Sequence, residues 1–102
     1  MNFYKEKRIE VICEAPIADR LVEIARKHGA RGFTIVPVQK GAGEAGHPRD
    51  GFLDESLGNV MLVIVANPET ADRVVEKIFP TIQAHSGVIT VGEVDVLRPE
   101  RF

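Results

Sequence analysis

The chain opens with a strand pattern followed by a helix pattern. From Arg8 to Glu14 apolar and polar residues alternate, which predicts a β-strand with one buried face. That face holds Ile9, Val11 and Cys13. After Pro16, a residue favoured in the first helical turn, apolar residues recur at helical spacing, at Ile17, Leu21, Ile24 and Ala25. We expect the helix to end at Gly29, since glycine is the preferred residue just past a helix.

Two further strands are predicted on either side of a long loop. Gly32 to Val38 is rich in β-branched residues, and Pro37, which has no backbone N–H, indicates an edge strand. Gln39 to Asn59 contains five glycines and neither Val nor Ile, which is typical of a loop. Val60 to Ala66 is continuously apolar and predicts a central strand covered on both faces.

The last part of the chain repeats the helix and strand. Asn67 and Pro68 are typical of a helix start, and Pro80 is expected to kink or restart this helix. Its apolar stripe is Ala71, Val74, Val75, Ile78 and Ile82. From Val88 to Leu97 the apolar alternation changes phase, and a β-bulge at Gly92 or Glu93 would reconcile the two phases.

The predicted order βαββαβ is that of a ferredoxin-like α+β sandwich with an antiparallel sheet, formed by residues 1–102 as one domain. Two helices cover only one face of such a sheet. The apolar character of Val60 to Ala66 therefore predicts that oligomerisation covers the other face.

Composition excludes several classes of protein. A net charge of −2 argues against a dedicated nucleic-acid binder, and no apolar run approaches the length that spans a bilayer. The single cysteine, Cys13, indicates a reducing compartment, so we expect a cytoplasmic protein. No nucleophile stands with a base in a recognisable catalytic arrangement, and one Cys with three scattered His residues matches no zinc site. We expect a protein without enzymatic activity.

Three short segments have the chemistry of a phosphate site. Lys40 to Gly43 combines glycines with an ammonium group, Ser86 and Gly87 form a second glycine corner, and Arg98 and Arg101 are two cations near the C-terminus. Each alone has a simpler interpretation: a flexible hinge, a turn and solvated surface charges.

Together, G-F-T-I-V-P-V-Q-K-G-A-G and S-G-V-I-T-V-G-E-V-D-V-L-R-P-E-R-F resemble the PII signalling family. The resemblance extends from Arg8 to Phe102 and is greatest to the divergent PII-like branch associated with bicarbonate transporters and carboxysomes. It implies a homotrimer whose sheets face one another around the three-fold axis, with adenine nucleotides bound in the clefts between subunits.

The resemblance also implies roles for individual residues. Thr34 would contact the adenine, beside Val63 and Val65. Lys40, Gly41 and Gly43 would meet the phosphates at the base of the family's T-loop, here residues 39–59. Ser86 and Gly87 occupy the place of the family's B-loop, and Arg98 and Arg101 fall in its cationic C-terminal segment.

The short segment A-H-S-G-V departs from the longer, glycine-rich B-loop with a lysine that the best-known PII proteins have. It favours ADP, AMP or cyclic AMP over tight binding of ATP with magnesium. The resemblance further suggests bicarbonate as a second ligand, and a regulated partner such as a transporter or a carboxysome-related protein.

The sequence thus predicts a non-enzymatic sensor whose T-loop becomes ordered when nucleotide binds. One alternative is a trimeric metal-handling protein or slow nucleotide hydrolase on the same fold, with His47 and His85 as its candidate ligands. Another is a structural interaction module that binds no small molecule.

Overall fold

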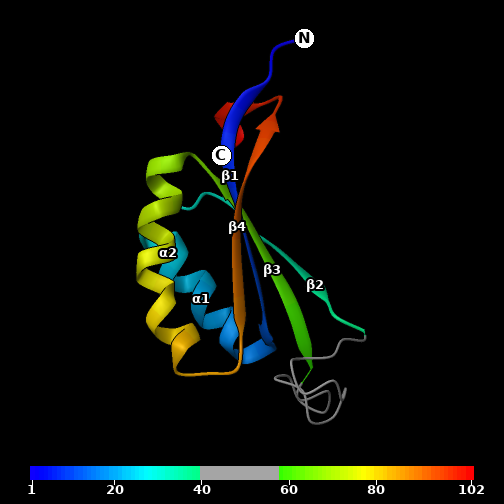
Figure 1. Cartoon of the computed structure of the whole chain (residues 1–102), viewed down its shortest axis with the longest axis vertical. Coiled ribbons are helices and arrows are strands. Elements are labelled where there is room, and N and C mark those ends of the chain that lie inside the picture. Colours follow the sequence, from blue (N-terminus) through cyan, green and yellow to red (C-terminus); the bar gives the residue numbers. More distant parts are fainter. Residues whose placement is uncertain (40–57) are drawn as a thin grey trace.

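A computed structural model of the protein describes residues 1–39 and 58–102. Within these ranges the elements follow the predicted order βαββαβ (Figure 1). They are β1 (Tyr4–Glu14), α1 (Ala15–Lys27), β2 (Thr34–Pro37), β3 (Asn59–Ala66), α2 (Pro68–Gln83), β4 (Val88–Val96) and a closing 3-10 turn, η2 (Pro99–Arg101). The loop predicted between β2 and β3 lies, from residue 40 to 57, outside the described residues.

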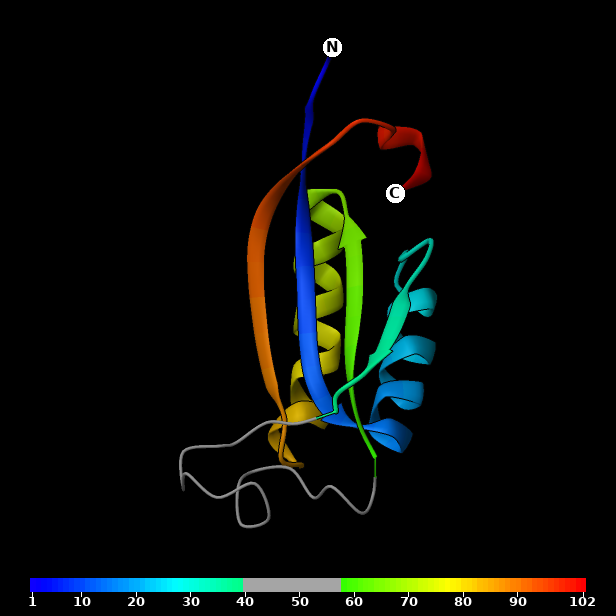
Figure 2. The same ribbon diagram turned by 90° about the vertical axis from the view of Figure 1, so that its right-hand side faces the viewer.

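The strands form one antiparallel sheet in the order β2-β3-β1-β4. Both helices pack against the same face, and the other face, which we call the open face, carries no helix of the described chain (Figures 1 and 2). β3 is central and β2 is an edge strand, as the apolar run and Pro37 predicted. The ferredoxin-like α+β architecture is therefore confirmed.

The core lies between the sheet and the two helices. Ile9, Val11 and Cys13, the predicted buried face of β1, are at most 1% exposed. They pack with buried residues of the other elements, including Leu21, Leu62, Ile64, Val74 and Ile78. Burial of each large side chain contributes roughly 1.5–3 kcal/mol, so this one contiguous cluster accounts for most of the force holding helices to sheet.

Both helices begin and end largely as the sequence predicted. The side chain of Asn67 accepts a hydrogen bond of 2.9 Å from the backbone N–H of Thr70, and Gly29, past the end of α1, has φ +107°. Pro80, however, does not divide α2, which continues to Gln83. Ile78 and Ile82, one on each side of Pro80, are both buried, so tertiary packing holds the helix together across the proline.

The predicted β-bulge in β4 is wrong. β1 and β4 pair in one unbroken register from Ile12 opposite Val88 to Tyr4 opposite Val96. Ile89 and Val91 lie on the helix-covered face, opposite Val11 and Ile9. The phase change has a different cause, because the later valines, Val94 and Val96, turn to the open face.

The open face is half-buried and mixed in character. Its apolar members on β3 are Met61, Val63 and Val65, and β1 places Arg8, Glu10 and Ile12 beside them. Arg8 Nε lies 2.6 Å from Glu10 Oε1, so these two charges pair with each other. None of the described helices is both long enough and apolar enough to cross a membrane.

Candidate functional site

A cleft of about 150 Å³ lies on the open face, where three distant stretches of chain meet. They are the segment entering β2, the middle of β3, and the C-terminal residues beyond β4. Figure 2 shows the chain after β4 crossing over the end of the sheet toward the start of β2. The lining residues are Gly32, Phe33, Thr34, Val63, Val65, Arg101 and Phe102.

Strand pairing forms the floor of the cleft. Thr34 stands directly opposite Val63, so both side chains project from the same face of the sheet. Val65 follows two residues later and points to that same face. The floor therefore combines one hydroxyl group with two half-buried valines.

The C-terminal turn forms one wall. Its shape comes from two local hydrogen bonds, Arg101 N–H to the Arg98 carbonyl at 3.0 Å and Phe102 N–H to the Pro99 carbonyl at 3.1 Å. A third hydrogen bond, from Arg31 Nη1 to the Glu100 carbonyl at 2.9 Å, connects the turn to the segment before β2. Arg101 and Phe102 thereby face the floor.

The cleft and its rim are cationic and aromatic. Arg101 lines the cleft, and the guanidinium carbon of Arg26 lies 6.0 Å from the centre of the Phe33 ring. Arginine stays protonated in proteins, so these charges are permanent. Apolar side chains, aromatic rings and fixed guanidinium groups together suit a ligand that is planar at one end and anionic at the other.

Four of the ten predicted ligand residues meet in this cleft: Thr34, Val63, Val65 and Arg101. Arg98 is not among the lining residues, and its Nε lies 3.8 Å from Glu100 Oε2 on the exposed side of the turn. Ser86 and Gly87 lie at the opposite end of the sheet, between α2 and β4 (Figure 1). Lys40, Gly41 and Gly43 lie outside the described residues.

Three lining residues were not among the predicted ones: Gly32, Phe33 and Phe102. The signal for the first two was their position immediately before Thr34 in the segment that resembles the PII family. A Cβ built at Gly32 meets no atom within 4 Å, so the space beside this glycine is part of the cleft. Phe102 gave no signal of its own, because its position depends on how the C-terminal turn folds back.

The described residues offer little support for the metal or catalytic alternatives. Residues 1–39 and 58–102 contain no cluster of three or more His, Cys, Asp or Glu side chains that could hold a metal ion. His85 is exposed, and His47 lies outside the described ranges. Burial, with a smaller contribution from Glu14, raises the pKa of the Cys13 thiol to about 11, so it stays protonated at neutral pH.

The sheet order and the cleft define the class, a ferredoxin-like domain with a small-molecule cleft on its open face. The profile of the family described as Nitrogen regulatory protein P-II matches residues 6–101. The chain therefore belongs to the P-II family, and it is a divergent PII-like member of it. No curated protein sequence matches it significantly.

Solved structures agree. The chain is 28% identical to CPII, a nitrogen regulatory PII-like protein from Thiomonas intermedia K12, in a structure bound to ADP, AMP and bicarbonate; the TM-score is 0.82, with 99% of this chain and 96% of that chain covered. It is 25% identical to CPII bound to ADP, AMP and acetate, with a TM-score of 0.81 and 100% and 98% covered. A PII-like signalling protein from Thermus thermophilus is also 25% identical, with a TM-score of 0.78 and 100% and 99% covered.

Proposed function

We propose that this protein is a signalling protein that binds an adenine nucleotide, ADP or AMP, in the cleft on its open face. The observation that carries the proposal is the meeting of Thr34, Val63, Val65 and Arg101 in one cleft, although they come from three distant stretches of sequence. Structures of CPII bound to ADP and AMP support the choice of ligand.

Each residue has a role that its chemistry suits. The Thr34 hydroxyl offers both a donor and an acceptor to the edge of the base, and Val63 and Val65 provide an apolar surface for the ring. Arg101 offers a charged donor to a phosphate oxygen, an interaction that arginine makes well because its N–H groups form a fork. We further propose that Lys40, Gly41 and Gly43 meet the phosphates from the base of the loop.

We also propose that the site is completed in a homotrimer. A typical small-molecule site has a volume of about 300–1,000 Å³, so the cleft of a single chain is too small to enclose a nucleotide. A neighbouring copy packed on the open face would enlarge it, and could bring Ser86, Gly87 and Arg98 to the ligand from the other side. A second hollow of about 280 Å³, over Gly92 on the same face, would be filled by that packing.

The signalling step we propose is a shift in the population of loop conformations. A nucleotide that contacts the loop of residues 39–59 in one conformation only would favour that conformation by its difference in affinity. The loop would then bind or release a regulated protein in inorganic-carbon metabolism, such as a transporter or a carboxysome-related protein. Bicarbonate, present with ADP and AMP in a CPII structure, is the proposed second ligand.

A thermal-shift screen tests this proposal, with ATP, ADP, AMP, cyclic AMP and bicarbonate added singly and in nucleotide-bicarbonate pairs. A ligand that binds only the folded protein raises Tm by mass action. We expect ADP or AMP to raise Tm, and bicarbonate to increase that rise. If no nucleotide raises Tm, the proposed ligand site is wrong; if the nucleotide is hydrolysed during the assay, the protein is an enzyme instead.

A further inference from the structure

We propose that Arg31 is a positioning residue for the nucleotide cleft: it holds the C-terminal turn in the place where Arg101 and Phe102 can close over a ligand. The ligand-binding part of this inference rests on the function proposed above. Its structural part concerns only the contact between Arg31 and the turn.

The contact joins residues far apart in the sequence. Arg31 Nη1 donates a 2.9 Å hydrogen bond to the backbone carbonyl of Glu100, which lies 69 positions further along the chain. Glu100 directly precedes Arg101, so this bond fixes the backbone from which the cationic side chain projects. Arg31 is not itself among the residues that line the cleft.

Little else in the described structure fixes the turn. Within residues 1–39 and 58–102, the other hydrogen bonds made by the turn are its own local ones, Arg101 to Arg98 and Phe102 to Pro99. The turn is three residues long, and none of its residues is buried. Local bonds define its shape, but only the bond from Arg31 ties that shape to the body of the protein.

Loss of this bond should weaken ligand binding without unfolding the protein. Arg31 is exposed and lies outside the core, so the sheet and helices do not depend on it. A free turn samples other positions, and only the fraction of molecules with the turn in place is competent to bind. The apparent Kd rises in inverse proportion to that fraction.

The chemistry of the bond suggests two substitutions. A carbonyl oxygen needs one donor, which a lysine ammonium can also supply, whereas alanine supplies none. Arg31→Ala should therefore remove the effect and Arg31→Lys should largely retain it. Arg20→Ala is the matched control, since Arg20 is an exposed arginine of α1 that does not line the cleft.

The first measurement is isothermal titration of each variant with ADP. We expect Arg31→Ala to raise the Kd about tenfold, the size expected for one hydrogen bond to a charged group, and Arg31→Lys to stay within about threefold of wild type. Arg20→Ala should bind as wild type does. An unchanged Kd in Arg31→Ala would overturn the proposal, as would an equal loss in Arg31→Lys.

A double-mutant cycle separates positioning from direct contact with the phosphate. If Arg31 acts through Arg101, then Arg31→Ala should cost little more once Arg101→Ala has been made. If the two losses simply multiply, Arg31 acts independently of Arg101 and is not its positioning residue.

Backbone ¹⁵N relaxation tests the contact without any ligand. We expect the order parameters of residues 100–102 to fall in Arg31→Ala, from values near those of the rigid backbone toward those of a flexible terminus, and to recover in Arg31→Lys. Unchanged order parameters would overturn the structural part. Wild-type protein that fails to bind ADP would instead contradict the proposed function, and the relaxation result would still decide whether Arg31 holds the turn.

Discussion

Thr34 and Val63 stand directly opposite each other in the antiparallel pairing of β2 with β3, and both line the cleft. The pairing fixes a hydroxyl group next to an apolar side chain on the same face of the sheet. A register shift of one residue would turn one of the two away, because alternate residues of a strand point to opposite faces. The relative position of these two groups is therefore as rigid as the sheet itself.

Replacing the hydroxyl of Thr34 tests its proposed role at the base. Thr34→Val keeps the shape and the β-branched character but removes the donor and acceptor, so ADP binding should weaken by about 0.5–1.5 kcal/mol, the value of a neutral hydrogen bond. Isothermal titration measures the change. Val36→Ala, on the same strand and face but outside the cleft, should bind normally. Normal ADP affinity in Thr34→Val would remove the residue from the site.

Arg101 should contribute more, because its hydrogen bond to a phosphate would be charged. We expect Arg101→Ala to weaken ADP binding by about 1–3 kcal/mol. The loss should be smaller for adenosine, which has no phosphate for Arg101 to contact. Comparing the two ligands by titration checks the assignment, and equal losses for both would place Arg101 against the nucleoside.

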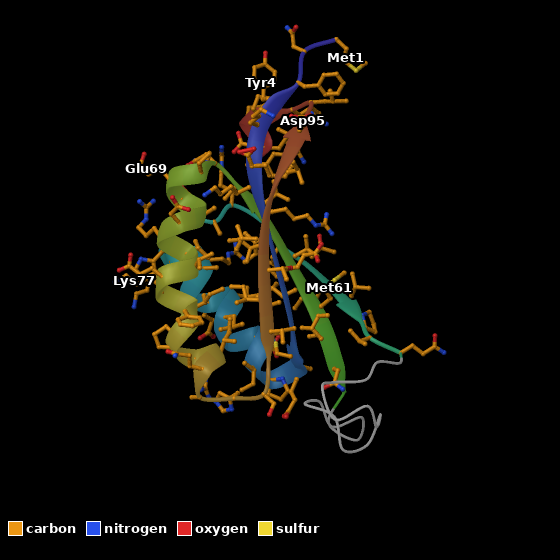
Figure 3. The ribbon with its side chains drawn as sticks, in the orientation of Figure 1. Met1, Tyr4, Met61, Glu69, Lys77 and Asp95 are labelled. Atoms are coloured by element: carbon orange, nitrogen blue, oxygen red, sulfur yellow. The ribbon has the colours of Figure 1, made fainter. Side chains whose placement is uncertain are left out.

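A charge on the open face should prevent the proposed trimer. Met61 lies between Ile12 and Val36 in a row across the sheet, on the face opposite the helices (Figure 3). Met61→Glu would bury an unpaired carboxylate if copies packed on this face, which is strongly unfavourable. Size-exclusion chromatography with light scattering should show a folded monomer.

The matched control is Lys77→Glu, which changes an exposed charge on α2 and leaves the open face intact. It should assemble as wild type does. A trimeric Met61→Glu protein would show that the subunits associate through another surface.

The stability of the protein should fall between pH 9 and pH 11 because of Cys13. Its pKa rises from 9.0 to about 11 on folding, chiefly through burial, so the native state holds a proton that the unfolded state has lost in this range. The free energy of unfolding should therefore decrease with rising pH, by about 2 kcal/mol over the interval.

Urea unfolding at pH 8, 9 and 10 measures this decrease. Cys13→Ala should start less stable, because it leaves a small cavity, but should show a shallower decline over the same interval. Other groups titrate equally in both proteins, so the difference between the two slopes reports on Cys13. Identical slopes would contradict the prediction.

The side chain of Asn67 should stabilise the start of α2. Its oxygen accepts the Thr70 N–H at 2.9 Å, and loss of such a cap costs about 1 kcal/mol. Asn67→Ala should lower Tm by roughly 4–8 °C for a domain of this size, and Asn67→Ser, which can still accept the bond, by much less. Thermal unfolding by circular dichroism checks both, and equal losses would show that the cap is not the cause.

Local sequence patterns predicted the elements of this fold but not every detail of their pairing. Alternation in β1, helical spacing in α1 and the Asn67-Pro68 start of α2 depend on neighbouring residues, and the structure confirms them. The bulge in β4 was wrong because the sequence cannot show that Val94 and Val96 belong to the open face. Likewise, the break at Pro80 was wrong because burial of Ile78 and Ile82 outweighs the missing hydrogen bond.

The cleft was predictable only in part. Thr34, Val63, Val65 and Arg101 followed from the family resemblance, since such residues keep their place in a shared fold. Phe102 and the contact of Arg31 with Glu100 depend on how the chain folds back after β4, which no local pattern records. The predicted roles of Lys40, Gly41, Gly43, Ser86, Gly87 and Arg98 stay predictions.

Because the cleft takes residues from positions 32–34, 63–65 and 101–102, it does not exist while the chain is still being made. A ribosome-bound chain can form β1, α1, β2 and β3 before the C-terminal wall has left the exit tunnel. Any molecule that binds the finished cleft would thus ignore nascent and truncated copies. Occupancy of the cleft would count only completed, folded chains.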